Sequence, residues 1–318
     1  MKSPDIISLG ELLVEIMRTE VDVPHGSPAE LYRGPFPSGA PAIFIDSAAR
    51  MTKPFNLSTG YIGVRGLDEF GDCIVSKLEQ DGVDVSQIRI SRTKTTGIAF
   101  YQYNSDGSRK FIFAAGAAGE ICQDDVNEEY FSNIKALHIM GSSLSISESS
   151  REACYKAILI TRKVNPKAII SFDPNLRPEM LDINAILEIS KPVLDETNIL
   201  LPSGEEAEML AGIIGEKAAC LKLLEKNPNI VVLKQGKRGA SVFIKGQKKE
   251  IHVPAFIVDE IDPTGAGDSF GGAFIVGYLQ GWSLEHALKF ANATGALNVK
   301  HFGPMSNDSY GEVISLID

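Results

Sequence analysis

Short apolar runs rich in β-branched residues alternate with amphipathic stretches along most of this chain, and this alternation restricts the fold more than any other feature. The runs, which predict strands, are 6–9, 136–140, 168–172, 198–201 and 230–233. The stretches between them, which predict helices, are 148–163, 185–193, 204–210 and 216–226. Such alternation forms β-α-β units around a mostly parallel sheet with helices on both faces. We therefore predict a three-layer α/β/α fold with one dominant domain.

The alternation breaks in two places, and both predict a small β element outside the main sheet. Residues 12–37 are rich in Pro and Gly, and residues 95–114 alternate polar and apolar side chains around the turn sequence 104–108. The second pattern is typical of a β-hairpin. A hairpin inserted in an α/β domain commonly forms a lid, although an edge hairpin without a role in function has the same pattern. We assign 12–37 and 95–114 to a β lid, and 1–11, 38–94 and 115–318 to the core.

The charge and polarity of the chain narrow the classes of partner. The formal net charge is -10, so long-range electrostatics oppose binding to nucleic acid and to anionic membranes. The sequence has no apolar run long enough to span a bilayer and no signal-peptide pattern before its first strand. Its four cysteines include no C-x-x-C pair, which is typical of reduced thiols. We therefore expect a cytoplasmic protein without nucleic-acid or membrane partners.

One glycine-containing segment, DPTGAGDSFGGAF at 262–274, carries the strongest signal for chemistry. It follows an expected strand at 252–258 and opens a helix whose apolar residues recur at helical spacing. Gly265 and Gly267 allow a tight turn and a close approach of the backbone to a ligand. The loop N–H groups and the positive end of the helix dipole form an anion site. Asp268 stands in the first turn of that helix, where we expect a low pKa and an ionised carboxylate at neutral pH.

An anion site beside an ionised carboxylate suits the transfer of a phosphoryl group to a hydroxyl. The N–H groups stabilise the charge of the transferring group, and the carboxylate accepts the proton of the attacking hydroxyl. The two familiar nucleotide motifs do not account for the segment, because residue 270 is Phe rather than Gly and no G-x-x-x-x-G-K-[ST] occurs. A plain helix start with Asp268 as a capping partner is the alternative, since acidic residues favour that position.

The segment 262–270 resembles the C-terminal signature of the ribokinase-like (PfkB) carbohydrate kinases, and the similarity extends in order over the whole chain. Other segments that resemble family elements are 10–13, 38–42, 66–71, 173–178 and 233–239. The resemblance is nearest to the 2-keto-3-deoxygluconate kinase and fructokinase branches. It implies a ribokinase-like core with a β-sheet lid, ATP as phosphoryl donor, Mg²⁺, and a sugar or keto-sugar as the small-molecule acceptor. It also implies a monovalent cation in some members and homodimers that pair through their lids.

The resemblance implies roles for individual residues of this chain. Asp268 is the expected base, and the N–H groups of Gly265, Ala266 and Gly267 are the expected site for charge on the γ-phosphate. The expected ATP-binding residues are Lys234, Gly236, Gly239, Gly265, Gly267 and Asn292, with Ala296 near the adenine. The expected substrate-binding residues are Glu15, Gly39, Ala40, Tyr101, Tyr103, Arg177 and Asp268. Glu206 ends the element that the family links to magnesium, and we expect it to act through water.

Four departures from the family pattern concern the substrate and the metal. Ile43 stands where members often carry an Asn that binds sugar hydroxyls, and Ile can neither donate nor accept. Glu15 replaces a shorter Asp and would reach a different hydroxyl. Phe113 and Ala114 stand where sugar-acid kinases tend to carry a Tyr and an Arg that bind the carboxylate of the substrate. The sequence therefore makes a sugar-acid substrate less favoured, without excluding it. In the magnesium element, Ser203 replaces Asn, which leaves only the acidic end.

Several side chains keep two interpretations. Arg177, or Arg33, is a candidate contact for an anionic substrate, but Arg177 also suits a structural salt bridge. Arg109 lies near the lid positions but out of register with them. Tyr101 and Tyr103 point to one face of the hairpin, where they either contact a sugar or pack within the lid or a dimer.

Two other functions fit parts of the pattern. A nucleoside kinase of the same fold needs an apolar base pocket, which Ile43, Phe44 and Tyr101 make conceivable. A non-catalytic sensor that binds a sugar or a nucleotide would explain the missing Asn and the altered magnesium element. The intact segment 265–268 favours an enzyme, because a binding protein needs no base beside an anion site.

Overall fold

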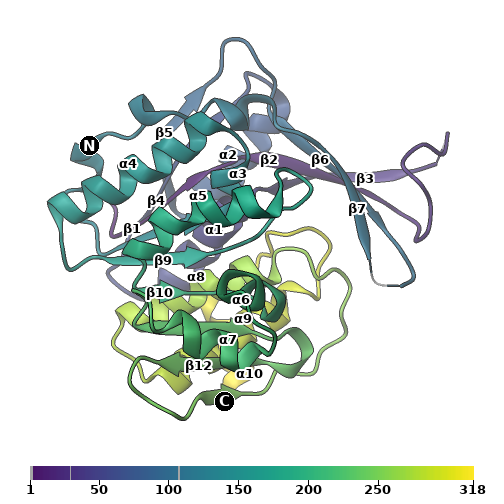
Figure 1. Ribbon diagram of the computed structural model, residues 1–318. Coiled ribbons are helices and arrows are strands. Elements are labelled where there is room, and N and C mark those ends of the chain that lie inside the picture. Colours follow the sequence, from purple (N-terminus) through teal and green to yellow (C-terminus); the bar gives the residue numbers. More distant parts are fainter. Residues whose placement is uncertain (1–2, 29, 107) are drawn as a thin grey trace.

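The computed structural model describes residues 3–28, 30–106 and 108–318 and places a large sheet between two layers of helices (Figure 1). Within these residues the spatial order of its nine strands is β13 (Ile251–Val253), β12 (Ala240–Ile244), β11 (Ile230–Lys234), β10 (Ile199–Leu200), β9 (Ile169–Asp173), β8 (Ala136–Met140), β1 (Ile6–Gly10), β4 (Thr59–Arg65) and β5 (Val83–Ile90). Neighbouring strands from β11 to β5 are parallel, whereas β12 and β13 form an antiparallel edge. The predicted α/β class with a mostly parallel central sheet is confirmed.

Successive residues of the central strands are buried on opposite faces of the sheet, which explains their continuous apolar sequences. In β11, Ile230 and Val232 belong to one hydrophobic core, and Val231 and Leu233 belong to the other. The first core is covered by α1 (Ala40–Thr52), α2 (Glu69–Asp81), α8 (Ala266–Leu279), α9 (Leu284–Asn298) and α10 (Tyr310–Ile317). The second lies under α3 (Gly141–Ser145), α4 (Glu148–Val164), α5 (Ile183–Glu196), α6 (Gly204–Ala211) and α7 (Glu216–Leu223).

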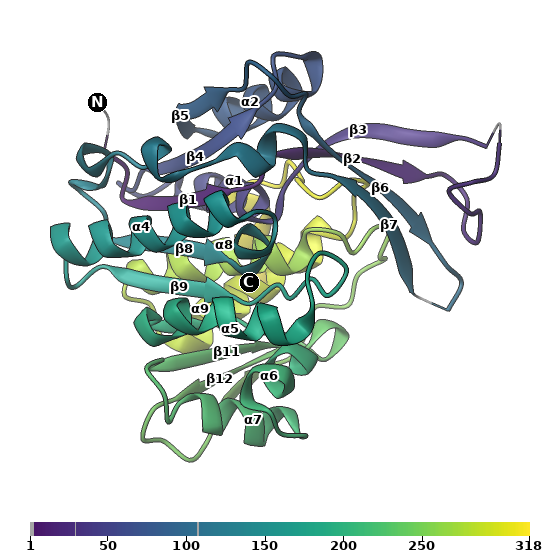
Figure 2. The same cartoon turned by 45° about the horizontal axis from the view of Figure 1, so that its top comes forward.

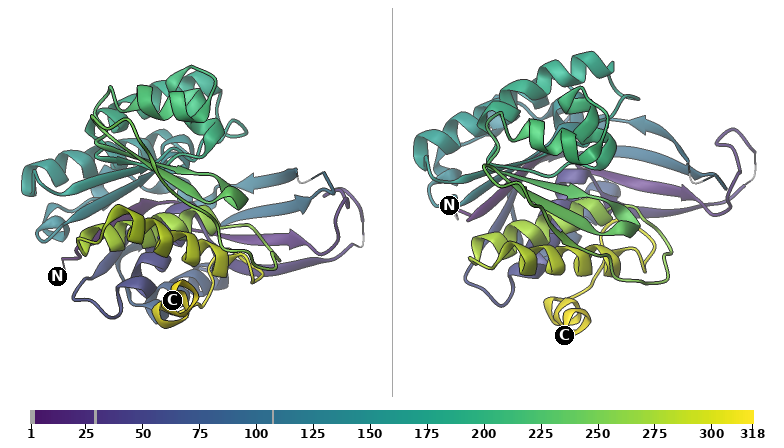
Figure 3. Two further views of the ribbon diagram at one scale, coloured as in Figure 1. Left: turned by 90° about the horizontal axis from the view of Figure 1, so that it is seen from below. Right: turned by 60° about the horizontal axis from the view of Figure 1, so that its bottom comes forward.

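Figure 3 shows the two helical layers on opposite sides of the sheet, with the teal and green helices on one side and the yellow-green α8 and α9 on the other. Short 3-10 helices lie in the connections, and they are η1 (Gly116–Glu120), η2 (Gln123–Asp125), η3 (Glu128–Phe131) and η4 (Gly236–Arg238). Within the described ranges, none of the helices combines the length and the apolar character that a bilayer crossing requires.

A second, smaller sheet projects from one side of the core (Figure 2). Its strands, in spatial order, are β3 (Tyr32–Ser38), β2 (Leu13–Arg18), β6 (Gly97–Tyr103) and β7 (Arg109–Ala114). The β6–β7 pair is the hairpin predicted over 95–114, and β2 pairs with β6 in parallel. Because side chains alternate across a strand, Tyr101 and Tyr103 share one face of this lid sheet, with their ring centroids 6.5 Å apart.

Helices α1 and α8 approach each other so closely that only glycine fits at the contact. A Cβ on Gly272 would lie 2.5 Å from the Phe44 carbonyl oxygen and 2.9 Å from the Ala48 nitrogen. The Ser47 hydroxyl also donates to the carbonyl oxygen of Ser269 at 2.8 Å. The position of the start of α8 is therefore tied to that of α1.

A buried ionic cluster holds the segment between α9 and α10. The Arg50 guanidinium is buried, with Nε 3.2 Å from Asp46 Oδ2 and Nη1 donating to the Asp308 carbonyl oxygen at 2.6 Å. Burial raises the pKa of Asp46 to about 7, although Arg50 and Lys77 act in the opposite direction. Lys77 donates to the Ser306 carbonyl oxygen at 2.9 Å. The segment after α9 is thereby fixed to α1 and α2.

The strand predicted at 252–258 is wrong in its extent, because β13 ends at Val253. Pro254 has no N–H with which to continue the ladder, and β12 pairs with β13 no further than Ala240 opposite Val253. The rest of that segment belongs to the loop that precedes α8. The other strands and helices named from the sequence are present, with ends that differ by three residues at most.

Candidate active site

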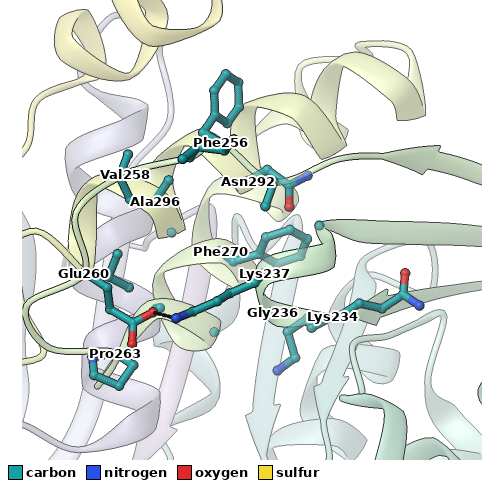
Figure 4. A pocket seen from close by; sticks show the side chains of 18 residues that line it. Lys234, Gly236, Lys237, Phe256, Val258, Glu260, Pro263, Phe270, Asn292 and Ala296 are labelled. Atoms are coloured by element: carbon teal, nitrogen blue, oxygen red, sulfur yellow. Dashed lines mark ion pairs between the residues drawn. The ribbon is translucent and has the colours of Figure 1, made fainter.

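Two adjoining cavities lie at the edge of the large sheet where β9 and β11 end. The apolar cavity, of about 470 Å³, is bounded by the end of β11, the loop before α8, and helices α8 and α9. Phe256, Ile257, Val258 and Phe270 form much of its wall. Figure 4 shows Phe256 and Asn292 on one side of this cavity, and Lys234 and Pro263 on the other.

The polar cavity, of about 240 Å³, lies between the core and the inner face of the lid sheet. Charged and polar side chains from both parts line it, among them Glu11, Glu15, Arg109, Asn175, Arg177 and Asp268. Apolar lid side chains, including Phe111 and Phe113, also line it. The polar cavity therefore combines acceptors, cations and aromatic surface.

The structure brings most of the residues expected from the sequence to these two cavities. The polar cavity contains Glu15, Gly39, Ala40, Tyr101, Arg177, Gly265 and Asp268. The apolar cavity contains Gly236, Gly239, Ala266, Asn292 and Ala296. Lys234 and Gly267 line both cavities, whereas Tyr103 and Glu206 line neither.

The loop before α8 turns through a glycine in the left-handed conformation. Gly265 is the N-cap residue of α8, with φ 77°, and a Cβ there would lie 2.3 Å from the Pro304 carbonyl oxygen. Asp262 Oδ2 accepts a hydrogen bond from the Gly303 N–H at 3.0 Å, so the loop is held against the segment after α9. The Ala266 N–H donates to the Pro263 carbonyl oxygen at 3.4 Å. Because the other first N–H groups of a helix have no intrahelical partner, the start of α8 is a candidate anion site between the two cavities.

Asp268 lies in the first turn of α8 and lines the polar cavity. Burial raises the pKa of Asp268 to about 6, against the lowering effects of Lys234 and Arg177. The low pKa expected from the helix start is therefore wrong, because the loss of hydration outweighs the helix dipole and both cations. The carboxyl group is still largely ionised at neutral pH, which lies about one unit above its pKa.

Two glutamates make one side of the polar cavity rich in acceptors. Glu11 accepts hydrogen bonds from the Ser142 hydroxyl at 2.5 Å and from the Ser143 hydroxyl at 2.7 Å. Glu15 is 3% exposed, and its Oε1 accepts from the Ser38 hydroxyl at 2.6 Å, but its Oε2 has no partner among the described residues. Burial raises the pKa of Glu15 to about 7. A buried acceptor without a donor is costly, so Oε2 favours a ligand with a hydroxyl at this place.

Two arginines supply positive charge to the polar cavity. Arg177 follows β9, and its Nη1 lies 3.8 Å from Glu179 Oε1, which is a loose contact for a structural salt bridge. Arg109 comes from the lid, where β7 pairs with β6 so that Arg109 lies opposite Tyr103. Arg109 lines the cavity, although the sequence pattern placed it out of register with the lid positions expected to hold a carboxylate. Arg33, in contrast, stacks over the Phe302 ring at 4.2 Å and lines neither cavity.

Tyr103 and Asn292 hold the loops around the cavities. The Tyr103 hydroxyl donates to Asp262 Oδ1 at 2.9 Å and lies 2.8 Å from the Thr264 hydroxyl oxygen. The Asn292 amide donates to the Val253 carbonyl oxygen at 3.0 Å. Tyr103 thus contacts the loop before α8, and the structure does not bring it to the wall of the polar cavity.

Glu206 acts as a helix cap in this structure. Its Oε2 accepts from the Ser203 N–H at 2.7 Å, and its Oε1 accepts from the Leu176 N–H at 2.9 Å. In the described part of the chain, no three metal-ligating side chains gather in one place. Direct ligation of a metal by Glu206 is therefore disfavoured, and the contact through water stays a prediction.

Asp173 is a candidate functional residue that the sequence analysis did not assign. It ends β9, is 1% exposed, and accepts a hydrogen bond from Lys234 Nζ through Oδ2. A carboxylate at the C-terminal end of a buried parallel strand is a usable signal, because ligands bind at that edge of open α/β sheets. The sequence showed the strand but could not show which cation would meet its last residue.

The comparisons with known proteins agree with this geometry. Residues 5–309 match the pfkB family carbohydrate kinases. The 5-dehydro-2-deoxygluconokinase of Clostridium perfringens is 27% identical over 334 residues, covering 98% of this chain and 96% of that protein. Probable fructokinase-5 of Arabidopsis thaliana is 31% identical over 306 residues, covering 93% and 91%. A candidate ribokinase II from E. coli, solved in complex with ATP and Mg²⁺, is 38% identical with a TM-score of 0.89 over 99% of each chain.

Replacing Gly265 by Ala should destabilise the protein and distort the anion site. The left-handed conformation costs about 1–2 kcal/mol for a residue with a Cβ, and the clash with Pro304 adds a similar amount. Gly281→Ala is the matched control, because Gly281 has φ 72° but no neighbouring atom within 4 Å of the added Cβ. Chemical unfolding should show a loss for Gly265→Ala that exceeds the control by at least about 1 kcal/mol. Equal losses would mean that the loop can move away from Pro304.

Proposed function

The chain belongs to the PfkB family of carbohydrate kinases, and on this premise we propose that it transfers the terminal phosphoryl group of ATP to a hydroxyl of a sugar or keto-sugar, with Asp268 as the base. The family match, the sugar kinases among its relatives and the ATP-bound relative support ATP-dependent phosphorylation of a sugar. The role of Asp268 and the class of acceptor are supported by the geometry of the two cavities.

One observation carries the proposal, and it is the position of residues 265–268 between the cavities. Ala266 lines the apolar cavity, Asp268 lines the polar cavity, and Gly267 lines both. The larger apolar cavity suits the base and ribose of a nucleotide, and the smaller polar cavity suits a sugar. A phosphoryl donor in one and an acceptor hydroxyl in the other meet at the anion site.

In this arrangement the groups of the site have separate tasks. The first N–H groups of α8 stabilise the charge of the transferring phosphoryl group. Asp268 accepts the proton of the acceptor hydroxyl while the hydroxyl oxygen bonds to phosphorus. Glu15 accepts a hydrogen bond from another hydroxyl through its unpartnered Oε2. The lid sheet covers the acceptor and excludes water, which would otherwise take the phosphoryl group.

The residues present are compatible with magnesium bound together with ATP. Mg²⁺ keeps several waters and is held largely by phosphate oxygens, so it does not require a dedicated cluster of carboxylates. Glu206 and Asp268 both raise the pKa of Asp173, after the larger effect of burial, which puts these carboxylates in one electrostatic neighbourhood. Glu206 would contact the ion through water. The ion would supply positive charge to the phosphate oxygens.

The two arginines of the polar cavity support an acceptor with an acidic group, although the same cavity wall also carries Glu11, Glu15, Glu179 and Asp268. The Arg109 guanidinium has no hydrogen bond or ion pair within the described ranges, and the Arg177 guanidinium has only its 3.8 Å contact with Glu179. The relative in Clostridium perfringens is named for a keto-deoxy sugar acid, whereas the Arabidopsis relative is named for a neutral ketose. We favour the sugar acid, because two guanidinium groups in one small cavity bind a carboxylate well.

A further cavity beside the polar cavity supports a second candidate acceptor. A further cavity of about 290 Å³ shares Phe111, Phe113, Glu179 and Met180 with the polar cavity. An aromatic group attached to a sugar, as in a nucleoside, would pack against these side chains. Phosphorylation of a nucleoside is therefore the second candidate function.

Asp268→Asn should lower kcat by at least ~10²-fold, because the variant has no base for the acceptor hydroxyl. Binding of ADP should change little, since Asp268 does not line the apolar cavity. An ADP-release assay with Mg-ATP and calorimetry with ADP measure the two effects. Turnover near that of the wild type would remove Asp268 from the role of base. A wild-type protein that binds sugar without any turnover would support the sensor interpretation.

The acceptor kcat/KM should fall as the pH drops through about 6, the raised pKa of Asp268. Only the ionised carboxylate accepts a proton, so activity is present above this pKa and is lost below it. Burial is the main cause of the raised value, with Glu11 and Glu206 acting in the same direction. A pH–rate profile at saturating ATP should show this acid limb. The limb should move in Asp268→Glu, whereas a limb due to ATP itself would stay. A limb near pH about 4 would contradict burial of the carboxyl group.

An acceptor screen should identify a keto-deoxy sugar acid rather than a neutral sugar. Arg109→Ala and Arg177→Ala should lower kcat/KM at least ~10-fold more for sugar acids than for neutral ketoses, because each removes a charge-assisted contact to the carboxylate. Arg92→Ala, at an exposed arginine that lines neither cavity, is the control. Equal losses of kcat/KM on neutral and acidic acceptors would mean that the arginines bind a phosphate group rather than the carboxylate of the acceptor. A response only to nucleosides would favour the second candidate.

A further inference from the structure

Lys234 lies at the junction of the apolar and polar cavities. It ends β11, and its side chain lines both cavities. A Cβ on Gly267 would lie 3.6 Å from Lys234 Nζ, so the ammonium group faces the first turn of α8. Among the described residues, it is the one cationic side chain shared by the two cavity walls. The place where the phosphoryl group crosses therefore holds a full positive charge beside the helix N–H groups.

A buried carboxylate holds this ammonium group in place. Asp173 Oδ2 accepts from Lys234 Nζ, while Oδ1 accepts from the Asn175 N–H at 3.3 Å. Within the described part of the chain Lys234 Nζ makes no other hydrogen bond, so two of its three donors are available to a ligand. A buried ion pair often adds little net stability, because both ions lose their hydration. The pair is better explained by a task in the site than by a contribution to folding.

We propose that Lys234 is a catalytic residue that binds the phosphoryl group during its transfer, and that Asp173 is a positioning residue that holds the Lys234 ammonium group at the junction of the cavities. This inference rests on the proposed kinase function. In this inference Lys234 contacts the phosphoryl group that is transferred, whereas the family resemblance implies only that Lys234 contacts ATP.

The transfer step balances without a further reactant. The acceptor oxygen forms a bond to the γ-phosphorus, and the bond from that phosphorus to the bridging oxygen breaks, with its electron pair leaving on ADP. The hydroxyl proton passes to Asp268. Lys234 keeps its own proton and neutralises charge on the phosphoryl oxygens, which pass from the donor to the acceptor at this point.

The same ammonium group also supports the base. Burial raises the pKa of Asp268, and Lys234 is the cation that opposes this rise most. Burial disfavours the charged form of Lys234 as well, but Asp173, Glu206 and Asp268 outweigh it, so the pKa of Lys234 is raised. Loss of the ammonium group should therefore weaken binding of the transferring group and also shift the ionisation of Asp268.

Lys234→Met removes the charge while keeping a long side chain, and it should lower kcat by at least ~10²-fold. The Kd for ADP, measured by calorimetry, should change by less than about threefold, because ADP lacks the transferred group. The acid limb of kcat/KM should move to higher pH and return toward the wild-type position in Lys234→Arg. Lys217→Met is the matched control, because Lys217 pairs with Glu250 at 2.5 Å and lines neither cavity. It should change none of these quantities.

Asp173→Asn tests the positioning role. It should lower kcat about 10-fold with ADP binding unchanged, because the ammonium group loses its anchor but stays in the site. In the Lys234→Met background it should cause no further loss, since Asp173 acts through Lys234. The double variant also removes both buried charges, so it keeps the test valid if an unpaired Asp173 destabilises the single variant.

Two results would overturn the assignment of Lys234. One is a kcat for Lys234→Met within about threefold of the wild type, and the other is a loss of ADP affinity as large as the loss of kcat. Additive losses in the double variant would overturn the positioning role of Asp173. Failure of the proposed kinase function gives a distinguishable result, because the wild type would then release no ADP with any acceptor. That result would contradict both the kinase function and the roles proposed for Lys234 and Asp173.

Discussion

The close contact between α1 and α8 determines the geometry at the carboxyl edge of the sheet. A side chain at Gly272 would meet the Phe44 carbonyl oxygen at 2.5 Å, so α8 cannot pack on α1 at this distance with any other residue there. The starts of the two helices, at Gly39 and Gly265, consequently line the same polar cavity. Helix starts that meet in one space concentrate partial positive charge there. This local field favours an anion at this place, although the chain has a formal net charge of -10.

Burial of carboxylates is the second feature that shapes the site. Loss of hydration raises the pKa of Asp268 to about 6 and those of Glu15 and Asp173 to about 7. Lys234 and Arg177 limit these shifts, because each stands close enough to favour the ionised form of Asp268. The result is a carboxyl group that changes its protonation state near neutral pH, which is the range in which a general base works best.

The lid contributes through the alternation of its strands. Because successive side chains point to opposite faces, Arg109, Phe111 and Phe113 of β7 line the polar cavity together with Tyr101 of β6. Tyr103 shares this face but reaches the loop before α8, where its hydroxyl donates to Asp262 at 2.9 Å. Asp262 also accepts from the Gly303 N–H, so one carboxylate links the lid to the segment that supports the anion site. The lid sheet and the loop before α8 are thus joined by hydrogen bonds.

The sequence by itself determined the fold class, the lid hairpin and the candidate segment 265–268, because apolar periodicity, turn residues and helix starts are local properties of a chain. Only the tertiary structure decided which charged side chains lie close enough to pair. Asp173 and Lys234 are 61 residues apart and pair only because β9 and β11 end at the same edge of the sheet. The expected low pKa of Asp268 failed for the same reason, since hydration depends on the assembled cavity and not on a residue's place in its helix.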